Sequence, residues 1–299
     1  ANSKHFGTFI HVFLSTLHLL FSDIDIVHFH ALGPSLFSFL PRVFGKKTIV
    51  TVHGLDWKRK KWKYAARLFL RLCEYPSIYF PNKTIAVSKN LKDYLENKYK
   101  RNVYYIPNGV DVFPEHIEEH ENINARAYIF FIGRLVPEKG IHYLIKAFRE
   151  LNTGMKLIIA GESSFTDDYV SYLHSISGPN VDFLGFVETE KVWELYKNAY
   201  LFVLPSEVEG SPVSLLEAMS YGKCVLVSDI PESLEIIANS GFSFKSRDYL
   251  DLKDKLRYLI DNPNVVKETG LRAKNRMREQ YRWGPIVNEL ERLYSSLLN

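Results

Sequence analysis

The sequence predicts an α/β protein built on parallel β-sheets. Short apolar runs rich in β-branched and aromatic residues alternate with longer stretches of helical periodicity. Most runs are continuously apolar and do not alternate with polar residues, which is typical of strands buried on both faces of a parallel sheet. The expected strands are Asp25–His30, Lys46–His53, Thr84–Ser88, Val103–Pro107, Tyr128–Gly133, Lys156–Gly161, Val181–Phe186, Leu201–Pro205, Cys224–Ser228 and Gly241–Phe244.

Helical stretches separate most of these runs, and two long ones follow the last run. Apolar residues in them recur at the spacing of one helix face. The expected helices are Phe6–Phe21, Leu91–Lys100, Ile141–Leu151, Glu190–Asn198, Val213–Tyr221, Val265–Tyr281 and Gly284–Leu298.

The length of 299 residues predicts two domains. The stretch Asn108–Arg126 is acidic and turn-rich and lacks periodicity, so it is the expected linker. The sign of the net charge changes at nearly the same place. Residues 1–110 carry 17 Lys and Arg against 6 Asp and Glu, whereas residues 111–299 carry 21 against 28. Opposite signs predict different partners for the two halves, and the basic half could face nucleic acid, a membrane surface or a phosphate-bearing substrate.

Composition excludes several classes of protein. Two cysteines, Cys73 and Cys224, cannot build a disulfide framework, so a reducing, cytoplasmic compartment is expected. The most apolar stretch, Phe6–Phe21, is interrupted by polar residues and is too short to span a membrane. The N-terminal residues lack the features of a signal peptide, so none is expected.

The first chemical motif follows the strand expected at Tyr128–Gly133. Arg134 leaves the carboxyl end of this strand after Gly133, and Lys139 opens the next expected helix. Ligands of open parallel sheets bind beyond the carboxyl ends of the strands. Two cations beside a helix N-terminus would suit a diphosphate, and the alternative is a solvated loop with two surface charges.

A second motif follows the strand expected at Leu201–Pro205. Ser211 is the expected N-cap of the next helix, and Pro212 its first residue. Glu209 lies in the loop, and Glu217 lies more than one turn into the helix. Their carboxylates could accept hydrogen bonds from sugar or ribose hydroxyls, and the amides near Gly210 and Ser211 would point into the same crevice. The alternative is two surface charges.

Three histidines follow or lie within the expected strands of the first half. His28 and His30 share one strand face, and His53 follows the next strand. Zinc is one use of such a group. Because no Cys, Asp or Glu completes a ligand spacing, we expect no metal site, a structural His28, and a polar contact from His53.

The segment Trp57–Arg71 combines seven cations with two tryptophans on an expected helix. Such a segment suits the surface of an anionic membrane. The alternatives are single-stranded nucleic acid stacked on the aromatic rings, or a solvated basic face.

Together these segments resemble a family 4 glycosyltransferase with the GT-B fold, in which two Rossmann-like domains face a cleft. The resemblance covers nearly all of the chain, and Asp25–Trp57 is similar to a bacterial surface-polysaccharide or rhamnosyltransferase branch. The motifs that carry it are Gly133-Arg134-x4-Lys139-Gly140, Glu209-x7-Glu217, Thr51-Val-His53-Gly54, Pro107-Asn-Gly-Val-Asp111 and Arg282-Trp-Gly-Pro-Ile-Val287.

The resemblance implies domains at 1–112 and 113–281, with 282–299 forming a helix that crosses back to the first domain. It also implies a donor site in the second domain. Arg134 and Lys139, next to Gly133, would bind the donor diphosphate, and Glu217 would hold the ribose hydroxyls.

The resemblance assigns the sugar to a second set of residues. Glu209 would hold sugar hydroxyls, the amides of Gly210 and Ser211 would lie near phosphate and sugar, and His53 would reach the sugar from the first domain. The family retains anomeric configuration without a metal or other cofactor. The implied partners are a nucleotide-sugar donor and a surface-glycan or polyprenyl-linked acceptor, and the implied location is the cytoplasm, with a peripheral contact to the inner face of the membrane.

The chain departs from the family at its start. The family opens with a strand and a Gly-Gly loop, whereas only four expected strands precede the linker here. We therefore expect an incomplete first domain in which Asp25–His30 is an edge strand. A chain of this kind would bind nucleotide without transferring sugar and would associate through that edge.

Two other functions remain as alternatives. A nucleotide-sugar epimerase on the same fold would need no acceptor. A nucleic-acid-binding protein would use the basic half, but it would leave Arg134, Lys139, Glu209 and Glu217 without a role, so nucleic acid is not an expected partner.

Overall fold

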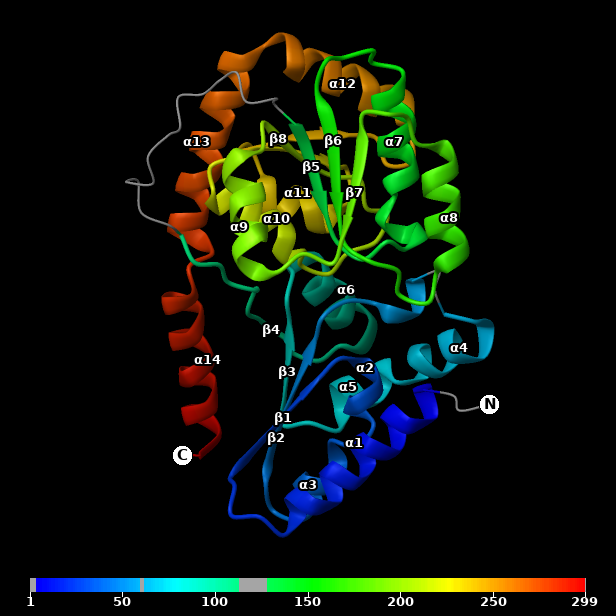
Figure 1. Cartoon of the computed structure of the whole chain (residues 1–299). Coiled ribbons are helices and arrows are strands. Elements are labelled where there is room, and N and C mark those ends of the chain that lie inside the picture. Colours follow the sequence, from blue (N-terminus) through cyan, green and yellow to red (C-terminus); the bar gives the residue numbers. More distant parts are fainter. Residues whose placement is uncertain (1–3, 60–61, 113–127, 299) are drawn as a thin grey trace. The chain divides into compact units, whose positions relative to one another are not determined.

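The computed structural model describes residues 4–59, 62–112 and 128–298, and the chain forms two compact units (Figure 1). The first unit contains Ala1–Asn108 together with Gly284–Asn299, and the second contains Gly109–Trp283. The expected linker falls largely on residues 113–127, which lie outside the described residues.

The first unit is built on a four-stranded parallel sheet with the order β1-β2-β3-β4. The strands are β1 (Ile26–His30), β2 (Lys47–Val52), β3 (Lys83–Ala86) and β4 (Tyr104–Tyr105). Among the described residues, strand β1 pairs with β2 alone and therefore lies at the edge of this sheet, as the sequence predicts.

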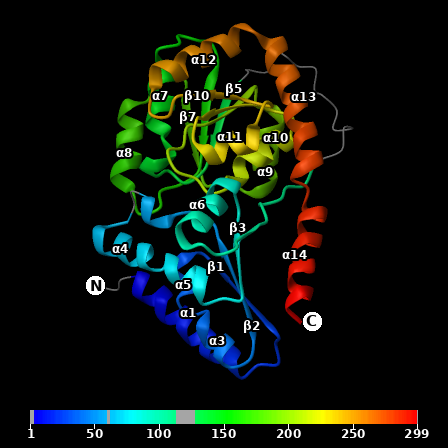
Figure 2. The ribbon, with the colours of Figure 1, turned by 180° about the vertical axis from the view of Figure 1, so that it is seen from behind.

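Helices cover both faces of the first sheet. They are α1 (Lys4–Leu20), α2 (Leu32–Ser35), α3 (Phe39–Val43), α4 (Tyr64–Leu72), α5 (Glu74–Tyr79), α6 (Lys89–Tyr99) and α14 (Trp283–Leu298), with a 3₁₀ turn at Asp56–Lys58. Figures 1 and 2 show α14 on one side of the sheet and α1, α3 and α5 on the other. Successive β2 residues point to opposite faces. Accordingly Ile49 packs with Ile286 and Leu293 of α14, while Val50 belongs to the core on the other face.

The second unit is built on a six-stranded parallel sheet with the order β10-β9-β8-β5-β6-β7. The strands are β5 (Tyr128–Ile132), β6 (Lys156–Ala160), β7 (Val181–Gly185), β8 (Leu201–Leu204), β9 (Cys224–Ser228) and β10 (Phe242–Phe244). The chain winds outward from β5 through β6 to β7, then restarts at β8 on the other side of β5. The strand order therefore reverses between β5 and β8, which is where open α/β sheets bind ligands.

Helices also cover both faces of the second sheet. They are α7 (Ile141–Arg149), α8 (Asp167–Ile176), α9 (Thr189–Asn198), α10 (Val213–Ser220), α11 (Pro231–Ile237), α12 (Tyr249–Asp261) and α13 (Pro263–Gln280), with a 3₁₀ turn at Pro137–Lys139. Helix α7 packs with α8 and α12, and α10 packs with α13. Figures 1 and 2 show α7 and α8 on one face of the sheet and α9, α10 and α13 on the other.

All ten expected strands are present within about three residues of their predicted ends, but one expected helix is wrong. The segment Trp57–Arg71 is not a single helix. A 3₁₀ turn ends at Lys58, Arg59 is extended, and α4 begins only at Tyr64. The reason is the Trp57 indole, which donates a hydrogen bond to the buried Glu74 carboxylate and so anchors the chain before α4.

Candidate functional site

Two glycines bring the loop after β5 against its neighbours at the reversal of strand order. Gly140 has φ +66°, and a Cβ there would lie 2.0 Å from the carbonyl oxygen of Pro205, which follows β8. Gly161, after β6, has φ +126°, and a Cβ there would lie 1.9 Å from the Gly133 carbonyl oxygen. Both positions therefore need glycine, and the carboxyl ends of β5, β6 and β8 are held close together.

The loop after β5 presents two cations in different ways. Lys139 is the last residue of the 3₁₀ turn, and α7 begins at Ile141, so Lys139 precedes the helix and does not open it. Its Nζ forms an ion pair with Glu209 Oε1 at 2.5 Å, and the two side chains are only 13% and 8% exposed. The Arg134 side chain is exposed and forms no ion pair or hydrogen bond with any residue that the structure describes. One cation is thus held in place, and the other is free.

The loop after β8 is tied down by Glu207, a buried residue that the sequence analysis did not single out. Its carboxylate accepts hydrogen bonds from Tyr143 Oη at 3.2 Å and from Arg247 Nε at 3.0 Å. Its amide donates to the Glu138 carbonyl oxygen at 2.8 Å. These contacts join the two loops that carry Lys139 and Glu209, which fixes the geometry of the ion pair.

Helix α10 begins at Val213, as in the expected helix Val213–Tyr221, but its cap differs from the prediction. Pro212 is the N-cap, with φ −70° and ψ 108°, and the helix begins at Val213. The Pro212 carbonyl accepts hydrogen bonds from Leu215 and Leu216, so the proline itself terminates the loop and Ser211 lies before the cap. Gly210 is buried, and among the described residues its amide has no hydrogen-bond acceptor.

Glu217 is a half-buried residue of α10 and not a surface charge. Tyr196 of α9 donates a hydrogen bond from its hydroxyl to Glu217 Oε2 at 2.9 Å. Burial raises the pKa of Glu217, and the Tyr196 hydrogen bond opposes that rise. Tyr196 was missed by the sequence analysis. Its signal was a tyrosine on the apolar stripe of a helix, because a buried phenol needs a partner for its hydroxyl.

His28, His30 and His53 of the first unit form a stacked row along β1 and the end of β2. His30 Nδ1 and His53 Nε2 are 3.0 Å apart, so one ring donates a hydrogen bond to the other. His28 is bonded through both ring nitrogens, at 2.7 Å to Tyr294 Oη and at 2.7 Å to Thr51 Oγ1. Its pKa is lowered to about 4, mainly by burial and also by His30 and His53, and burial lowers the pKa of His30 and His53 as well.

No group of three or more His, Cys, Asp or Glu side chains suited to a metal ion occurs among residues 4–59, 62–112 and 128–298. Both nitrogens of His28 are occupied by protein partners, which agrees with a structural role for that ring. The His30 and His53 rings hydrogen-bond each other and no other described side chain.

Helix α4 forms the exposed part of the segment Trp57–Arg71, which is rich in cations and aromatic residues. Tyr64, Leu68 and Leu72 are spaced four residues apart and are 83%, 48% and 65% exposed. Arg67 and Arg71 are exposed beside them. Trp57 is not part of this outward surface, since its indole points to Glu74. Within the described residues, no helix is long and apolar enough to cross a membrane.

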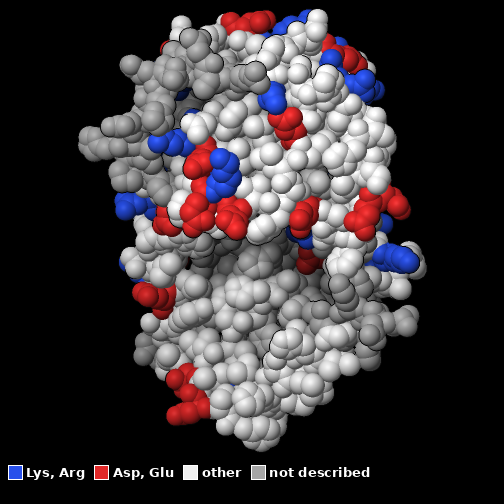
Figure 3. Space-filling model, in the orientation of Figure 1, with Lys and Arg blue, Asp and Glu red and all other residues white. Residues whose placement is uncertain are grey.

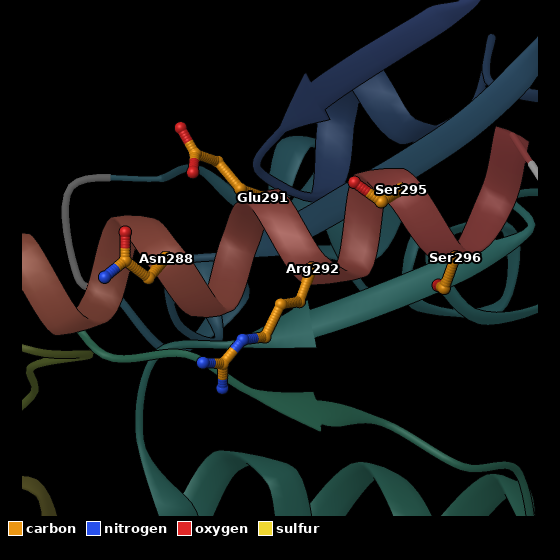
Figure 4. Close-up of a pocket in the computed structure, with 5 residues that line it drawn as sticks. All are labelled: Asn288, Glu291, Arg292, Ser295 and Ser296. Atoms are coloured by element: carbon orange, nitrogen blue, oxygen red, sulfur yellow. The ribbon is translucent and has the colours of Figure 1, made fainter.

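Two other surfaces, the visible face of the second unit and a depression on α14, do not combine residues of one kind. Figure 3 shows acidic and basic side chains interspersed on the visible face of the second unit, which is not the single-sign surface typical of nucleic-acid binding. A shallow depression on α14 is lined by Asn288, Glu291, Arg292, Ser295 and Ser296. Figure 4 shows these side chains spread along one helix and pointing in different directions.

Comparison with known proteins identifies the family. Residues 112–279 match the glycosyl transferases group 1 family, and residues 3–112 match Glycosyltransferase Family 4. The capsular polysaccharide biosynthesis glycosyltransferase CapM of Staphylococcus aureus is 26% identical over 272 residues, covering 84% of this chain and 70% of CapM.

Two further proteins extend the comparison. N,N'-diacetylbacillosaminyl-diphospho-undecaprenol alpha-1,3-N-acetylgalactosaminyltransferase of Campylobacter jejuni is 26% identical over 240 residues, covering 74% of this chain and 62% of that protein. The Anabaena protein Alr3699/HepE, solved in complex with UDP and glucose, superposes with a TM-score of 0.83 at 18% identity, over 95% of this chain and 81% of that one. The two parallel-sheet units are those of the GT-B fold, and the chain belongs to the group 1 and family 4 glycosyltransferases.

Proposed function

We propose that this glycosyltransferase moves a sugar from a nucleotide-sugar donor to a surface-glycan or lipid-linked acceptor, with retention of anomeric configuration and without a metal ion. The observation that carries the proposal is the Lys139–Glu209 pair at the reversal of strand order, with the free Arg134 on the same loop. In the reaction, the bond between the anomeric carbon and the diphosphate oxygen breaks, a bond to the acceptor oxygen forms, and the proton of the acceptor hydroxyl passes to the leaving diphosphate.

The two cations serve the leaving group. A nucleoside diphosphate leaves with additional negative charge, which Arg134 and Lys139 would stabilise by charge-assisted hydrogen bonds. Lys139 is already placed by Glu209, so little reorganisation is needed when a phosphate arrives. Glu209 then shares its carboxylate between Lys139 and the sugar hydroxyls.

The remaining residues bind the rest of the donor. Glu217 would accept hydrogen bonds from the ribose diol through its carboxylate, and the buried Gly210 amide would face phosphate or sugar. His53, kept neutral by its lowered pKa, would donate or accept a hydrogen bond at a sugar hydroxyl.

The acceptor class is supported by what the relatives act on. CapM is named for capsular polysaccharide biosynthesis, and the Campylobacter enzyme is named for an undecaprenol diphosphate acceptor. On α4, the exposed apolar stripe of Tyr64, Leu68 and Leu72 lies beside two arginines. We therefore include a peripheral contact of α4 with anionic lipid, which would bring a polyprenyl-linked acceptor near the enzyme.

Thermal shift with UDP-, GDP-, ADP- and dTDP-sugars tests donor binding, and at least one should raise the melting temperature with and without EDTA. Loss of that shift in EDTA would contradict metal independence.

NMR of the transferred sugar should show the anomeric configuration of the donor, and an inverted product would contradict retention. Sugar product formed without acceptor would favour the epimerase instead.

Vesicle sedimentation tests the membrane contact. The chain should sediment with phosphatidylserine-containing vesicles and not with pure phosphatidylcholine vesicles, and rising salt should release it. Replacement of both Leu68 and Leu72 by Ser should abolish sedimentation, whereas Leu184→Ser, an exposed leucine of the second unit, serves as the matched control. Equal sedimentation with both lipids would contradict the proposal.

A further inference from the structure

We infer that Tyr196 is a positioning residue for donor recognition, which aims the Glu217 carboxylate at the ribose diol of the nucleotide. The inference rests on the proposed role of Glu217. It assigns a function to a residue of α9 that would touch neither the nucleotide nor the sugar.

The contact between the two side chains is direct. The Tyr196 hydroxyl lies 2.9 Å from Glu217 Oε2 and 3.1 Å from the Ser214 carbonyl oxygen, one turn earlier on α10. Its single proton is therefore shared between the carboxylate and the backbone of the helix that carries it. Among the described residues no other group hydrogen-bonds this carboxylate, which leaves Oε1 open for a ligand hydroxyl.

The phenol ring is held so that its hydroxyl has little freedom. Tyr196 is fully buried, its ring centroid is 5.3 Å from that of Phe130, and its ring stacks on Tyr221 at 5.6 Å. Phe130 belongs to β5, the strand whose following loop carries Arg134 and Lys139. Tyr196 thus joins the ribose-side carboxylate to the same strand that supports the phosphate-side cations.

The hydroxyl also favours the charged form of the carboxylate. Burial alone raises the pKa of Glu217, and donation from Tyr196 lowers it. An ionised carboxylate accepts hydrogen bonds at both oxygens, whereas a protonated one has lost part of that capacity. The titratable groups facing Glu217 are Tyr196 of α9 and Tyr221 at the end of α10, and burial raises the pKa of both phenols, so both are neutral near pH 7.

Calorimetry with UDP and with 2′,3′-dideoxy-UDP tests the inference. The wild type should bind UDP more tightly than the dideoxy compound. Tyr196→Phe keeps the ring and removes the hydroxyl, so it should weaken UDP binding about tenfold and leave dideoxy-UDP binding unchanged, because only the diol uses Glu217. On acidification, UDP affinity of Tyr196→Phe should begin to fall at a higher pH than that of the wild type.

Tyr128→Phe is the matched control, since the Tyr128 hydroxyl bonds the carbonyl of Leu195, the neighbour of Tyr196 on α9, at 2.8 Å. It should leave both affinities unchanged. When Tyr196→Phe is combined with Glu217→Gln, it should lower UDP affinity little further. We expect this even if Tyr196→Phe alone makes the protein less stable. Equal weakening of UDP and dideoxy-UDP by Tyr196→Phe, or no weakening, would overturn the inference.

The same data separate the inference from the function on which it rests. A wild type that binds neither UDP nor GDP contradicts the proposed donor site. A wild type that binds UDP and dideoxy-UDP equally contradicts the role of Glu217 and therefore the role of Tyr196. A wild type that prefers UDP and a Tyr196→Phe variant with the same preference contradict the role of Tyr196 alone.

Discussion

Two of the lysine–carboxylate pairs, Lys98–Glu74 in the first unit and Lys139–Glu209 in the second, differ in what surrounds them. In the first unit, Glu74 is fully buried and accepts hydrogen bonds from Trp57, Lys98, Tyr94 and Tyr99. In the second unit, the Glu209 carboxylate has Lys139 as its one partner among the described residues. A saturated carboxylate ties elements together, whereas a carboxylate with unused acceptor capacity, beside a free cation, can still bind a ligand. The first pair therefore serves the fold, and we propose that the second serves the reaction.

The largest effect is expected at the saturated pair. Glu74→Ala leaves the indole of Trp57, the Lys98 ammonium and the Tyr99 hydroxyl without their acceptor, and it should destabilise folding by about 3–5 kcal/mol. Urea unfolding monitored by circular dichroism measures this. A change in the free energy of unfolding under about 1 kcal/mol would show that the hydrogen bonds of Glu74 contribute little to stability.

Arg134→Ala should have a large effect on binding and a small one on folding. It removes a charge-assisted contact to the diphosphate, so UDP affinity should fall about tenfold or more. Because the side chain is exposed and free of protein partners within the described residues, the melting temperature should not change. Calorimetry and a thermal melt on the same sample measure both, with Arg149→Ala, whose guanidinium bonds the Ile176 carbonyl, as the control. Unaltered UDP affinity would exclude Arg134 from the phosphate site.

Glu209→Ala should lower the affinity for a UDP-sugar more than the affinity for UDP. We expect it to weaken binding of a UDP-sugar several-fold more than binding of UDP, because hydrogen bonds of about 1 kcal/mol each are lost to the sugar alone, whereas the loss of the Lys139 partner affects both ligands. Comparison of the two dissociation constants measures the difference. If UDP and the UDP-sugar are weakened equally, Glu209 acts on the nucleotide through Lys139 and not on the sugar.

The effect expected to be smallest at neutral pH is a pH dependence of folding in the first unit. The pKa of His28 is lowered in the folded state to about 4, from an ordinary value of 6.5, so the unfolded chain binds more protons between these values. Stability should therefore fall as pH drops from about 6.5 towards 4. His28→Gln, which keeps hydrogen-bonding capacity without titrating there, should reduce this slope in denaturant unfolding. An identical slope would assign the pH dependence to other groups.

The alternation of buried runs and helical stretches predicted the strands well, because parallel strands buried on both faces are continuously apolar. The failure at Trp57–Arg71 came from one long-range contact, Trp57 to Glu74, which no local pattern reveals. The same holds for the site. The spacing of Arg134 and Lys139 indicated a phosphate-binding loop, but the partnership of Lys139 with a carboxylate 70 residues later depends on the order of β5 and β8.

Two residues of the proposed site could not be predicted from the sequence for a related reason. Glu207 and Tyr196 act through contacts between loops or helices that are distant in sequence. The cap of α10 was assigned wrongly because Ser211 and Pro212 each match a helix-start pattern, and only the dihedral angles of Pro212 decide between them.

The most direct test of the account exchanges each lysine of the two pairs for a residue of similar length without charge. Lys98→Met and Lys139→Met are compared by calorimetry with UDP and by thermal melting. Lys98→Met should lower the melting temperature and leave UDP affinity unchanged. Lys139→Met should weaken UDP binding about tenfold or more, since it removes a charged contact to the diphosphate. UDP affinity unchanged in Lys139→Met, or lowered equally in both variants, would contradict a donor site at the Lys139–Glu209 pair.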